Sequence, residues 1–284
     1  MKKTDLCDLH THSTASDGTY TPAELILAAE ETGLYAIALT DHNVVKGLPE
    51  FYRAAEGKRV RAIGGVEFST DYGEKELHIV ALFVKEEYYS AIQALVSKMV
   101  ESKKACNLEL AKRLNDAGYT VDYPRMYEEN DGHINRTHFA RELMARGYVN
   151  SIEEAFDTVL SKDGSFYTQP KRLDSLEVIS FIKSIGAVSV LAHPFLNLTE
   201  EELRRFLPKA KEAGLDAMET EYSTYDEPTH ALANEIAREF NLLQSGGSDF
   251  HGISKPDISL GCGRGALNVP KEIFLKLEEA SRKR

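Results

Sequence analysis

Short apolar runs alternate with helical patterns in the first and last parts of the chain, and this alternation constrains the fold most strongly. Segment 35–40 (YAIALT) has the composition of a buried strand. Segment 22–32 before it begins at Pro22, after a potential N-cap at Thr21, and stops before Gly33, as helices do. This alternation predicts an α/β fold with a mostly parallel sheet or barrel. We expect strands at 6–9, 35–40, 60–66, 76–84, 187–191, 215–219 and 242–245.

The middle of the chain lacks this alternation. Residues 86–117 form a long helical pattern that ends at Gly118, and no β-rich run interrupts residues 86–165. We therefore predict that residues 1–85 and 166–284 form the α/β barrel and that residues 86–165 form a helical insertion. Further helices are expected in the insertion at 124–130, 138–146 and 152–160, and after it at 175–184, 199–213, 227–240 and 271–284.

Composition excludes several classes of protein. With 34 Lys and Arg against 45 Asp and Glu, the formal charge is −11, which disfavours nonspecific binding to duplex nucleic acid. No run approaches the roughly 18 apolar residues of a membrane span, so we expect no membrane partner. The three cysteines are scattered and form no CxxC motif, which is typical of a reducing compartment and predicts a cytoplasmic protein without thiolate metal ligands.

Histidines and carboxylates follow the predicted strands. The carboxyl ends of the parallel strands in a barrel meet at one face, where the loops build the active site. We therefore expect these side chains to lie close together. They are His10 and His12 after the first strand, His42 after the second, Glu67 after the third, His193 after 187–191, and Asp249 and His251 after 242–245.

His78 begins a predicted strand rather than following one. The gap before it, residues 68–77, is too short for a helical crossover, and residues 71–73 have the composition of a turn. A hairpin at this turn would bring His78 back beside Glu67, at the same end of the sheet as the other histidines.

This cluster predicts bound metal ions. Residues i and i+2 of a strand share one face, so His10 and His12 can both reach one ion. The competing interpretation is a set of separate core or surface histidines, but so many imidazoles in one place would repel protons unless metal ions held them neutral. Nitrogen and oxygen ligands without thiolate suit Mn, Fe or Zn and do not suit a site built for Mg or Ca alone.

Several residues are candidates for substrate binding. Arg136, Thr137 and His138 lie at a predicted helix start, where free N–H groups and an arginine can bind a phosphate. The alternative is a helix capped by Asn135 or Thr137 beside a solvated arginine. Lys171, Tyr222 and Ser223 are further candidates: Lys171 for phosphate, and Tyr222 for stacking on a base or for packing, with Ser223 beside it.

The motifs resemble those of the polymerase-and-histidinol-phosphatase (PHP) family of metal-dependent phosphoesterases. The resemblance rests on DLHTHSTASDGTYTPAELILAAEETGLYAIALTDHN, GGVEFS, ELHIVALF, LAHP and GGSDFHG, and it covers residues 5–85 and 165–268. The insertion, with INRTHFARELMARGYV at 134–149, is similar to the branch that contains nucleoside 3′,5′-bisphosphate phosphatases and 5′→3′ exoribonucleases. The resemblance implies a distorted (β/α)₇ PHP barrel that holds two or three divalent ions.

The resemblance also implies a ligand set and a chemistry. The first ion would be held by His10, His12, Glu67 and Asp249, the second by Glu67, His78 and His193, and the third by Asp17, His42 and His251. A bridging hydroxide would attack the phosphorus, with Glu67 bridging two ions and Asp249 or His193 moving a proton. No protein nucleophile is then required, and the sequence contains neither a G-x-S-x-G elbow nor a P-loop.

The expected function is therefore hydrolysis of phosphomonoesters of small nucleotides, or of the 5′ ends of short oligoribonucleotides, with the insertion acting as a substrate-recognition lid. Two alternatives stay open at this point: a histidinol-phosphate phosphatase and a non-catalytic metal-stabilised module. The sequence gives no signal for an oligomeric state.

Overall fold

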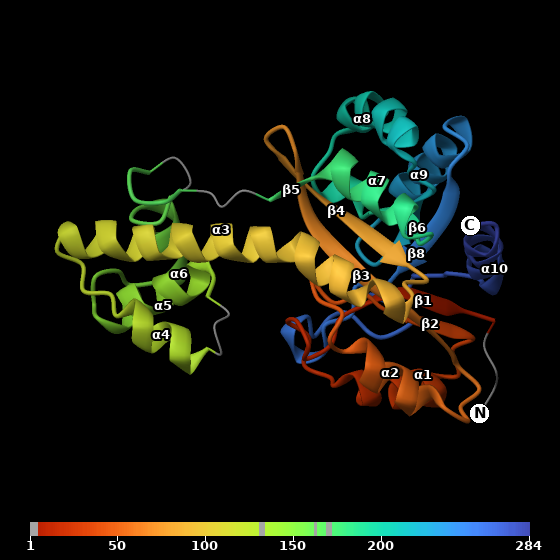
Figure 1. The fold of residues 1–284 in the computed structure, drawn as a ribbon, viewed down its shortest axis with the longest axis horizontal. Coiled ribbons are helices and arrows are strands. Elements are labelled where there is room, and N and C mark those ends of the chain that lie inside the picture. The colour runs from red at the N-terminus through yellow and green to blue at the C-terminus, as the bar shows by residue number, and fades with distance from the viewer. Residues whose placement is uncertain (1–4, 131–133, 162–163, 169–171) are drawn as a thin grey trace. The chain divides into compact units, whose positions relative to one another are not determined.

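A computed structural model of the chain describes residues 5–130, 134–161, 164–168 and 172–284. It divides into two compact units, residues 1–96 with 172–284 and residues 97–171 (Figure 1). The strands, all in the first unit, are β1 (Cys7–Thr11), β2 (Ala36–Leu39), β3 (Arg61–Tyr72), β4 (Lys75–Leu82), β5 (Leu173–Asp174), β6 (Val188–Ala192), β7 (Ala217–Tyr222) and β8 (Leu243–Gly247).

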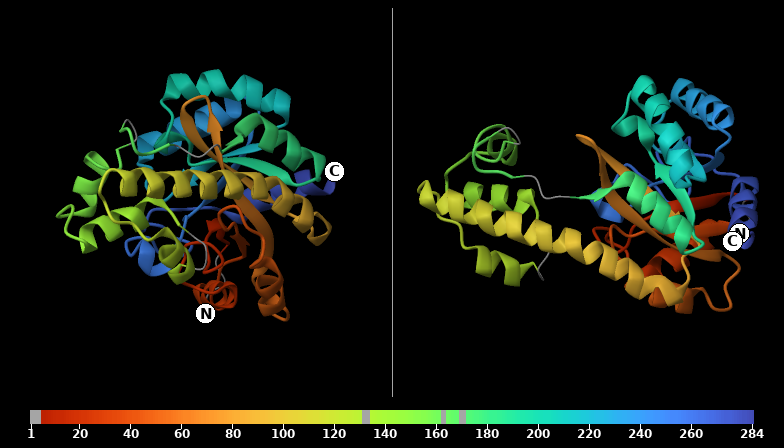
Figure 2. Two further views of the ribbon diagram at one scale, coloured as in Figure 1. Left: turned by 60° about the vertical axis from the view of Figure 1, so that its left-hand side comes forward. Right: turned by 45° about the horizontal axis from the view of Figure 1, so that its top comes forward.

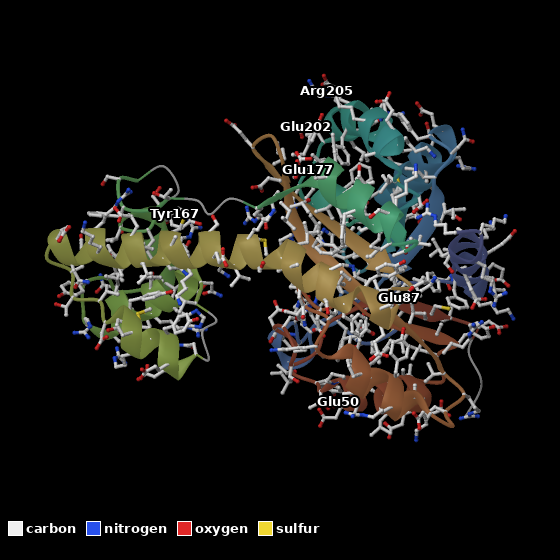
Figure 3. All side chains as sticks on the ribbon, in the orientation of Figure 1. Glu50, Glu87, Tyr167, Glu177, Glu202 and Arg205 are labelled. Carbon is white, nitrogen blue, oxygen red and sulfur yellow. The ribbon has the colours of Figure 1, made fainter. Side chains whose placement is uncertain are left out.

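Helices cover this sheet in the first unit. They are α1 (Pro22–Thr32), α2 (Leu48–Ala55), α7 (Ser175–Ser184), α8 (Glu200–Ala213), α9 (Glu227–Glu239) and α10 (Lys271–Arg282), with 3₁₀ turns at η1 (Glu86–Tyr88), η2 (Pro194–Leu196) and η3 (Gly252–Ser254). Charged side chains are exposed on these helices, for example Glu177 on α7 and Arg205 on α8 (Figure 3).

The sheet is an almost closed barrel. Its strands follow the order β1-β2-β3-β4-β6-β7-β8, and β5 pairs with β3. Strand β4 is antiparallel to both of its neighbours, and the other pairs are parallel. Beyond the end of β8, Asp249 N–H donates to His10 C=O at 2.9 Å, and Thr11 forms a parallel bridge with Phe250, which links the last strand to the first. Figure 2 shows this curvature from two sides. The predicted α/β barrel is confirmed.

The predicted hairpin is also present. Strands β3 and β4 pair from Gly65–Leu82 to Tyr72–Lys75, and His78 lies opposite Ser69. Strand β3 continues to Tyr72, beyond the expected end at residue 66, because its second half finds a partner in β4. Glu67 is therefore inside a strand, and the prediction that it follows one is wrong. It still reaches the carboxyl end of β2, because Glu67 N–H donates to Thr40 C=O at 3.1 Å.

Two irregularities in the ladders decide which side chains enter the barrel. In β1 the register shifts between Asp8 and Thr11, and in β7 it shifts between Glu219 and Glu221. An extra residue in one strand turns the following side chains to the other face. The first shift lets His10 face the barrel interior although Leu9, its neighbour, also packs inside.

The barrel interior is apolar at the end opposite to the histidines. A buried cluster joins alternate residues of the strands to helix α10, including Leu9 of β1, Val190 of β6 and Phe274 of α10. Helix α2 was not among the expected elements. Its N-cap position is Gly47, which makes no side-chain cap bond, so the local start signal is weak.

The second unit has its own core. Helix α3 (Tyr89–Asp116) contributes residues to both units, and α4 (Tyr123–Glu129), α5 (Arg136–Ala145) and α6 (Ile152–Asp157) belong to the second. Leu114, Phe139, Leu143 and Leu160 are all 0 % exposed in one cluster, so these helices bury a core of their own. Across the described residues, no helix combines the length and apolar character that a bilayer span requires.

Candidate metal centre

The structure brings the nine predicted ligand residues together at one end of the barrel. Three groups offer atoms close enough to share an ion: His10, His12 and Glu67; His42, Glu67 and His78; and His12, Asp17, His42 and His251. The remaining two also reach this cluster, since His193 Nε2 lies 3.1 Å from Glu67 Oε1 and Asp249 Oδ1 lies 3.2 Å from His12 Nε2.

Glu67 lies at the centre and is completely buried. Its Oε1 lies 2.8 Å from His78 Nδ1 and 3.1 Å from His193 Nε2. Its Oε2 lies 2.9 Å from His42 Nδ1 and 3.3 Å from the Nε2 atoms of His10 and His12. One carboxylate thus faces five imidazoles with both oxygens, which is the arrangement required of a bridging ligand.

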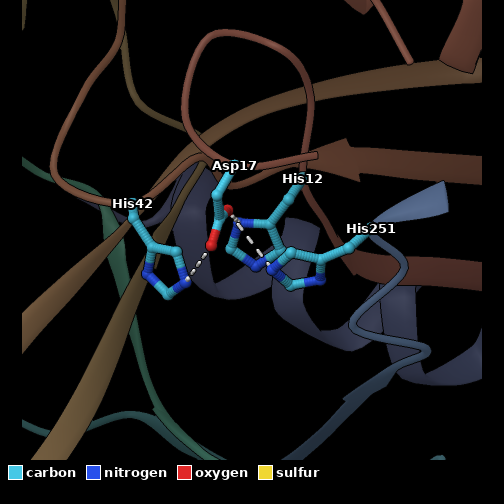
Figure 4. A group of neighbouring side chains, drawn as sticks. All are labelled: His12, Asp17, His42 and His251. Atoms are coloured by element: carbon cyan, nitrogen blue, oxygen red, sulfur yellow. Dashed lines mark ion pairs between the residues drawn. The ribbon is translucent and has the colours of Figure 1, made fainter. Parts of the chain in front are cut away.

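Asp17 forms a second, more open group with three imidazoles (Figure 4). Its carboxylate lies 3.3 Å from His251 Nε2, 3.9 Å from His42 Nε2 and 3.9 Å from His12 Nδ1. The Asp17 side chain is 57 % exposed, whereas the His12 side chain is 0 % exposed. This group therefore opens toward solvent, and the group around Glu67 is closed.

Unsatisfied polar atoms indicate what the cluster holds. Among the described residues, several buried site atoms make no hydrogen bond: His10 Nε2, both ring nitrogens of His12, His42 Nδ1 and Glu67 Oε2. Leaving such groups unpaired costs about 1–3 kcal/mol each. Divalent cations would bind the lone pair of each ring and the Glu67 oxygen, so the nitrogen and oxygen donors fit metal ions.

The charges in the metal-free cluster stabilise one another. Burial disfavours the Glu67 carboxylate, but the imidazoles around it, led by His42, hold its pKa well below the usual range. Burial likewise disfavours a charged His78, yet Glu67 raises the pKa of this ring to about 10. The pKa of His12 is lowered by burial and by the neighbouring His42. Metal ions would replace the protons that these rings share with the carboxylates.

Two site residues have strained backbones. His193 has φ of 28° and Asp249 has φ of 55°, both in the left-handed region that residues other than glycine rarely occupy. Hydrogen bonds hold both: His193 N–H donates to Glu219 Oε2 at 2.7 Å, and Asp249 N–H donates to His10 C=O at 2.9 Å. Strain of this kind concentrates at functional sites, where the surroundings enforce it.

A model of the PHP domain matches residues 8–165, which is more than half of the chain. The chain belongs to the PHP family. A 5′-3′ exoribonuclease of Haemophilus influenzae is 33% identical over 246 residues, covering 86% of this chain and 89% of the relative. A phosphoribosyl 1,2-cyclic phosphate 1,2-diphosphodiesterase of Eggerthella lenta is 31% identical, covering 86% and 94%. A 3′,5′-nucleoside bisphosphate phosphatase of Chromobacterium violaceum is 28% identical, covering 95% and 96%.

A solved structure has a similar fold. An amidohydrolase from Chromobacterium violaceum with bound sulfate superposes with a TM-score of 0.76 and 27% sequence identity, covering 96% of each chain. This superposition extends over nearly all of the chain, whereas the match to the PHP-domain model ends at residue 165.

The metal cluster of this PHP barrel borders a pocket of about 210 Å³. Its lining residues are His42, Glu67, Glu76, His78, His193, Leu196, Asn197, Tyr222, Asp249 and Lys255. Among the described residues of this lining, Lys255 is the only lysine or arginine, and its Nζ lies 2.7 Å from Asp249 Oδ2. Sequence reasoning missed Lys255, although it lies only four residues after His251.

The side chains of Tyr222 and Ser223 make different contacts. Tyr222 lines the pocket as expected, but it is 4 % exposed and its hydroxyl donates to Asp249 Oδ2 at 2.7 Å. Ser223 donates its hydroxyl to Ser248 C=O at 2.6 Å and is absent from the pocket lining. Of the two, Tyr222 lines the described pocket, and a substrate role for either residue stays a prediction. Lys171 lies outside the described residues.

The start of helix α5 is capped internally. The Asn135 side chain accepts from the backbone N–H groups of Thr137 and His138, and the His138 ring accepts from Asn135 N–H at 3.1 Å. The Arg136 guanidinium lies over the rings of Phe156 and Tyr167, at 4.6 and 4.8 Å from their centroids. The Asn135 cap of the competing interpretation is therefore present, but Arg136 packs against two aromatic rings and is not a solvated side chain. A substrate role for this segment stays a prediction.

Two buried acids hold the site in place and were also missed. Asp8 accepts from Ser248 N–H, from the Ser248 hydroxyl and from Gly261 N–H, and burial raises its pKa to about 6. Asp41 accepts from the backbone and hydroxyl of Ser13 at 2.7 Å each, and from Ser16. Asp8 fixes the loop that presents Asp249, and Asp41 fixes the loop that presents Asp17. A buried acid immediately before a candidate ligand is the sequence signal that could have found Asp41.

Proposed function

We propose that this chain uses two or three divalent ions (Mn, Fe or Zn) to hydrolyse phosphomonoesters of small nucleotides, such as nucleoside 3′,5′-bisphosphates, or the 5′ ends of short oligoribonucleotides. The chain is a PHP-family, metal-dependent phosphoesterase. One observation carries the proposal: six histidines and three carboxylates meet beside a pocket, with buried imidazole nitrogens that lack hydrogen-bond partners.

The donor groups suggest how the ions would be shared. The first would be held by His10, His12, Glu67 and Asp249, the second by Glu67, His78 and His193, and the third by Asp17, His42 and His251. Divalent ions bound in this way lower the pKa of water and offset the charge of phosphoryl oxygens. The bridging role of Glu67 is supported by its two oxygens, each of which faces at least two imidazoles.

Asp249 and His193 both take part in this proposal. Burial opposes a charged Asp249, but the His12 and His10 rings hold its pKa well below the usual range, so it stays ionised and accepts hydrogen bonds. Tyr222 and Lys255 both donate to its Oδ2, which leaves Oδ1 directed at the histidines. His193 borders the pocket, as Asp249 does, and both are candidates for moving a proton to the leaving oxygen.

The decisive test of the chemistry is Glu67→Gln. Replacing the central carboxylate removes the bridging charge with little change of shape, so we expect phosphate release to fall to background and the content of bound Mn²⁺ to drop. Both quantities are measured on the same preparation, by phosphate assay and by metal analysis after gel filtration. Full activity with unchanged metal content would end the proposal.

A substrate panel tests the substrate class. We expect Mn²⁺-dependent phosphate or nucleotide release from 3′-phosphoadenosine 5′-phosphate or from a 5′-phosphorylated dinucleotide, and little from histidinol phosphate. AMP tests whether one phosphate is sufficient, and phosphoribosyl 1,2-cyclic phosphate tests the activity named for the Eggerthella lenta relative. Turnover of histidinol phosphate or of the cyclic diester alone would assign the enzyme to another substrate class.

We further propose that the helical insertion selects the substrate through Arg136, Thr137, His138 and Lys171. Arg136→Ala should raise KM for a 3′,5′-bisphosphate more than KM for a monophosphate, because the arginine would bind the second phosphate. Arg125→Ala is the matched control, since Arg125 pairs with Glu129 and Glu142 in the same unit. Equal changes of KM on both substrates would show that Arg136 serves only the packing of its unit.

A further inference from the structure

Glu219 is a buried carboxylate that the proposed chemistry does not use. It belongs to β7 and is 1 % exposed, and it is not a member of any of the three ligand groups. Burying a carboxylate is costly unless hydrogen bonds or charges compensate it. Its partners therefore indicate why the fold keeps it there.

Both oxygens of Glu219 bind residues of the metal centre. Oε1 lies 2.8 Å from His10 Nδ1, and Oε2 accepts from His193 N–H at 2.7 Å. His10 and His193 are proposed ligands of two different ions. The bond to His193 also holds a backbone that is strained at φ of 28°.

The bond to His10 determines which ring nitrogen is available to a metal. A carboxylate at Nδ1 keeps a proton on that nitrogen, so Nε2 is the nitrogen whose lone pair a metal ion can take. His10 Nε2 is one of the buried atoms without a hydrogen-bond partner, and it lies 3.3 Å from Glu67 Oε2. Carboxylates that orient metal-binding histidines in this way strengthen metal affinity by about 10- to 100-fold.

We propose that Glu219 is a positioning residue that fixes one ligand in each of two neighbouring ion sites, so that both sites depend on a single side chain that touches neither ion. The inference rests on the proposed function. It has a chemical signature, because both groups bound to Glu219 are N–H donors. A glutamine has the same shape but only one oxygen, so one of the two donors would face its NH₂ group.

The chain supplies a matched control on the same strand. Glu221 lies two residues away, but the register shift between Glu219 and Glu221 separates their faces. Glu221 contacts His230 Nδ1 at 3.1 Å and Asn234 Nδ2 at 3.2 Å, and neither belongs to the metal centre. Glu219→Gln and Glu221→Gln thus make the same chemical change inside and outside the barrel.

The test is a titration of the full-length, metal-free protein with Mn²⁺ alone, followed by calorimetry. We expect Glu219→Gln to weaken two of the binding events by about 10- to 100-fold, and to spare the one assigned to Asp17, His42 and His251. Glu221→Gln should bind as the unmodified protein does. Unchanged Mn²⁺ affinity in Glu219→Gln would overturn the inference, as would an equal loss in both variants.

A second measurement needs no variant and covers the case in which Glu219→Gln does not fold. With ¹⁵N-labelled histidine and Zn²⁺, nuclear magnetic resonance reports the tautomer of each ring, and His10 should carry its proton on Nδ1. A proton on His10 Nε2 would refute the role of Glu219. If the unmodified protein binds neither Mn²⁺ nor Zn²⁺, the proposed function itself fails, and that result is distinct from both outcomes above.

Discussion

Tyr222 combines two roles that sequence reasoning treats as alternatives. It faces the site, as its position at the end of a strand predicts, and it is also packed, with its ring 5.2 Å from that of His193. Its hydroxyl donates to Asp249 Oδ2, and burial together with this carboxylate raises its pKa above the usual range. Tyr222 therefore remains a neutral donor at any pH at which the protein is folded.

Tyr222→Phe should consequently weaken catalysis without unfolding the protein. It removes one donor from Asp249 and leaves the Lys255 bond in place, so we expect kcat/KM to fall about tenfold, or about 1.4 kcal/mol. Tyr52→Phe is the control, because the Tyr52 hydroxyl accepts from Gly64 N–H and contacts no site residue. Steady-state kinetics on the best nucleotide substrate decides the question. An unchanged kcat/KM, or an equal fall in the control, would contradict the prediction.

The candidate ligands at the ends of strands could be predicted from the sequence. The residues that hold these ligands in place could not. His10, His42, His193 and Asp249 follow or end apolar runs, and the barrel brings such positions together. Glu219 is different: in a regular strand it would share a face with Glu221, and only the register shift between them sends one inward and the other outward. A sequence pattern carries no signal for such a shift.

Among the elements, apolar runs predicted each long strand of the barrel, but their ends depend on partners. Strand β3 continues past Val66 because β4 folds back on it, a long-range fact that the local pattern does not contain. Helix α2 was not predicted because it starts without a side-chain cap. Strand β5 has only two residues, Leu173–Asp174, too few for any periodicity to appear.

The close contact between strands β8 and β1 allows a test at the level of secondary-structure elements. A Cβ on Gly247 would lie 2.4 Å from the Cβ of His10, so the two strands approach closely only because a glycine is there. Gly247→Ala should cost about 1–3 kcal/mol of unfolding free energy and also weaken Mn²⁺ binding, because His10 must move.

Gly57→Ala is the control for this change. Gly57 has φ of 72° and open space around it, so alanine there adds backbone strain of about 1 kcal/mol and no contact with the site. Urea unfolding and Mn²⁺ titration are measured on both variants. The prediction is wrong if Gly247→Ala binds Mn²⁺ as tightly as Gly57→Ala does.

At the scale of the whole molecule, the metal centre couples stability to pH. In the metal-free protein, burial opposes charged rings, but Glu67 raises the pKa of His78 to about 10 and also raises the pKa of His10 and His42. His78 therefore holds a proton near pH 8 that the unfolded chain, with histidine pKa values near 6.5, has released, and the raised pKa values of His10 and His42 act in the same direction. Stability must then fall as pH rises above about 6.5, by about 1.4 kcal/mol per pH unit for each retained proton.

Bound metal should reverse this trend, because ions take the places of the retained protons and bind more tightly as protons become scarce. We expect the melting temperature in EDTA to fall from pH 7 to 8.5, and the gap between Mn²⁺-loaded and metal-free protein to widen over the same range. His78→Gln lacks one raised group, so its melting temperature in EDTA should fall less steeply. If the melting temperature in EDTA stays constant or rises over this range, Glu67 does not raise the pKa of these histidines, and the prediction is wrong.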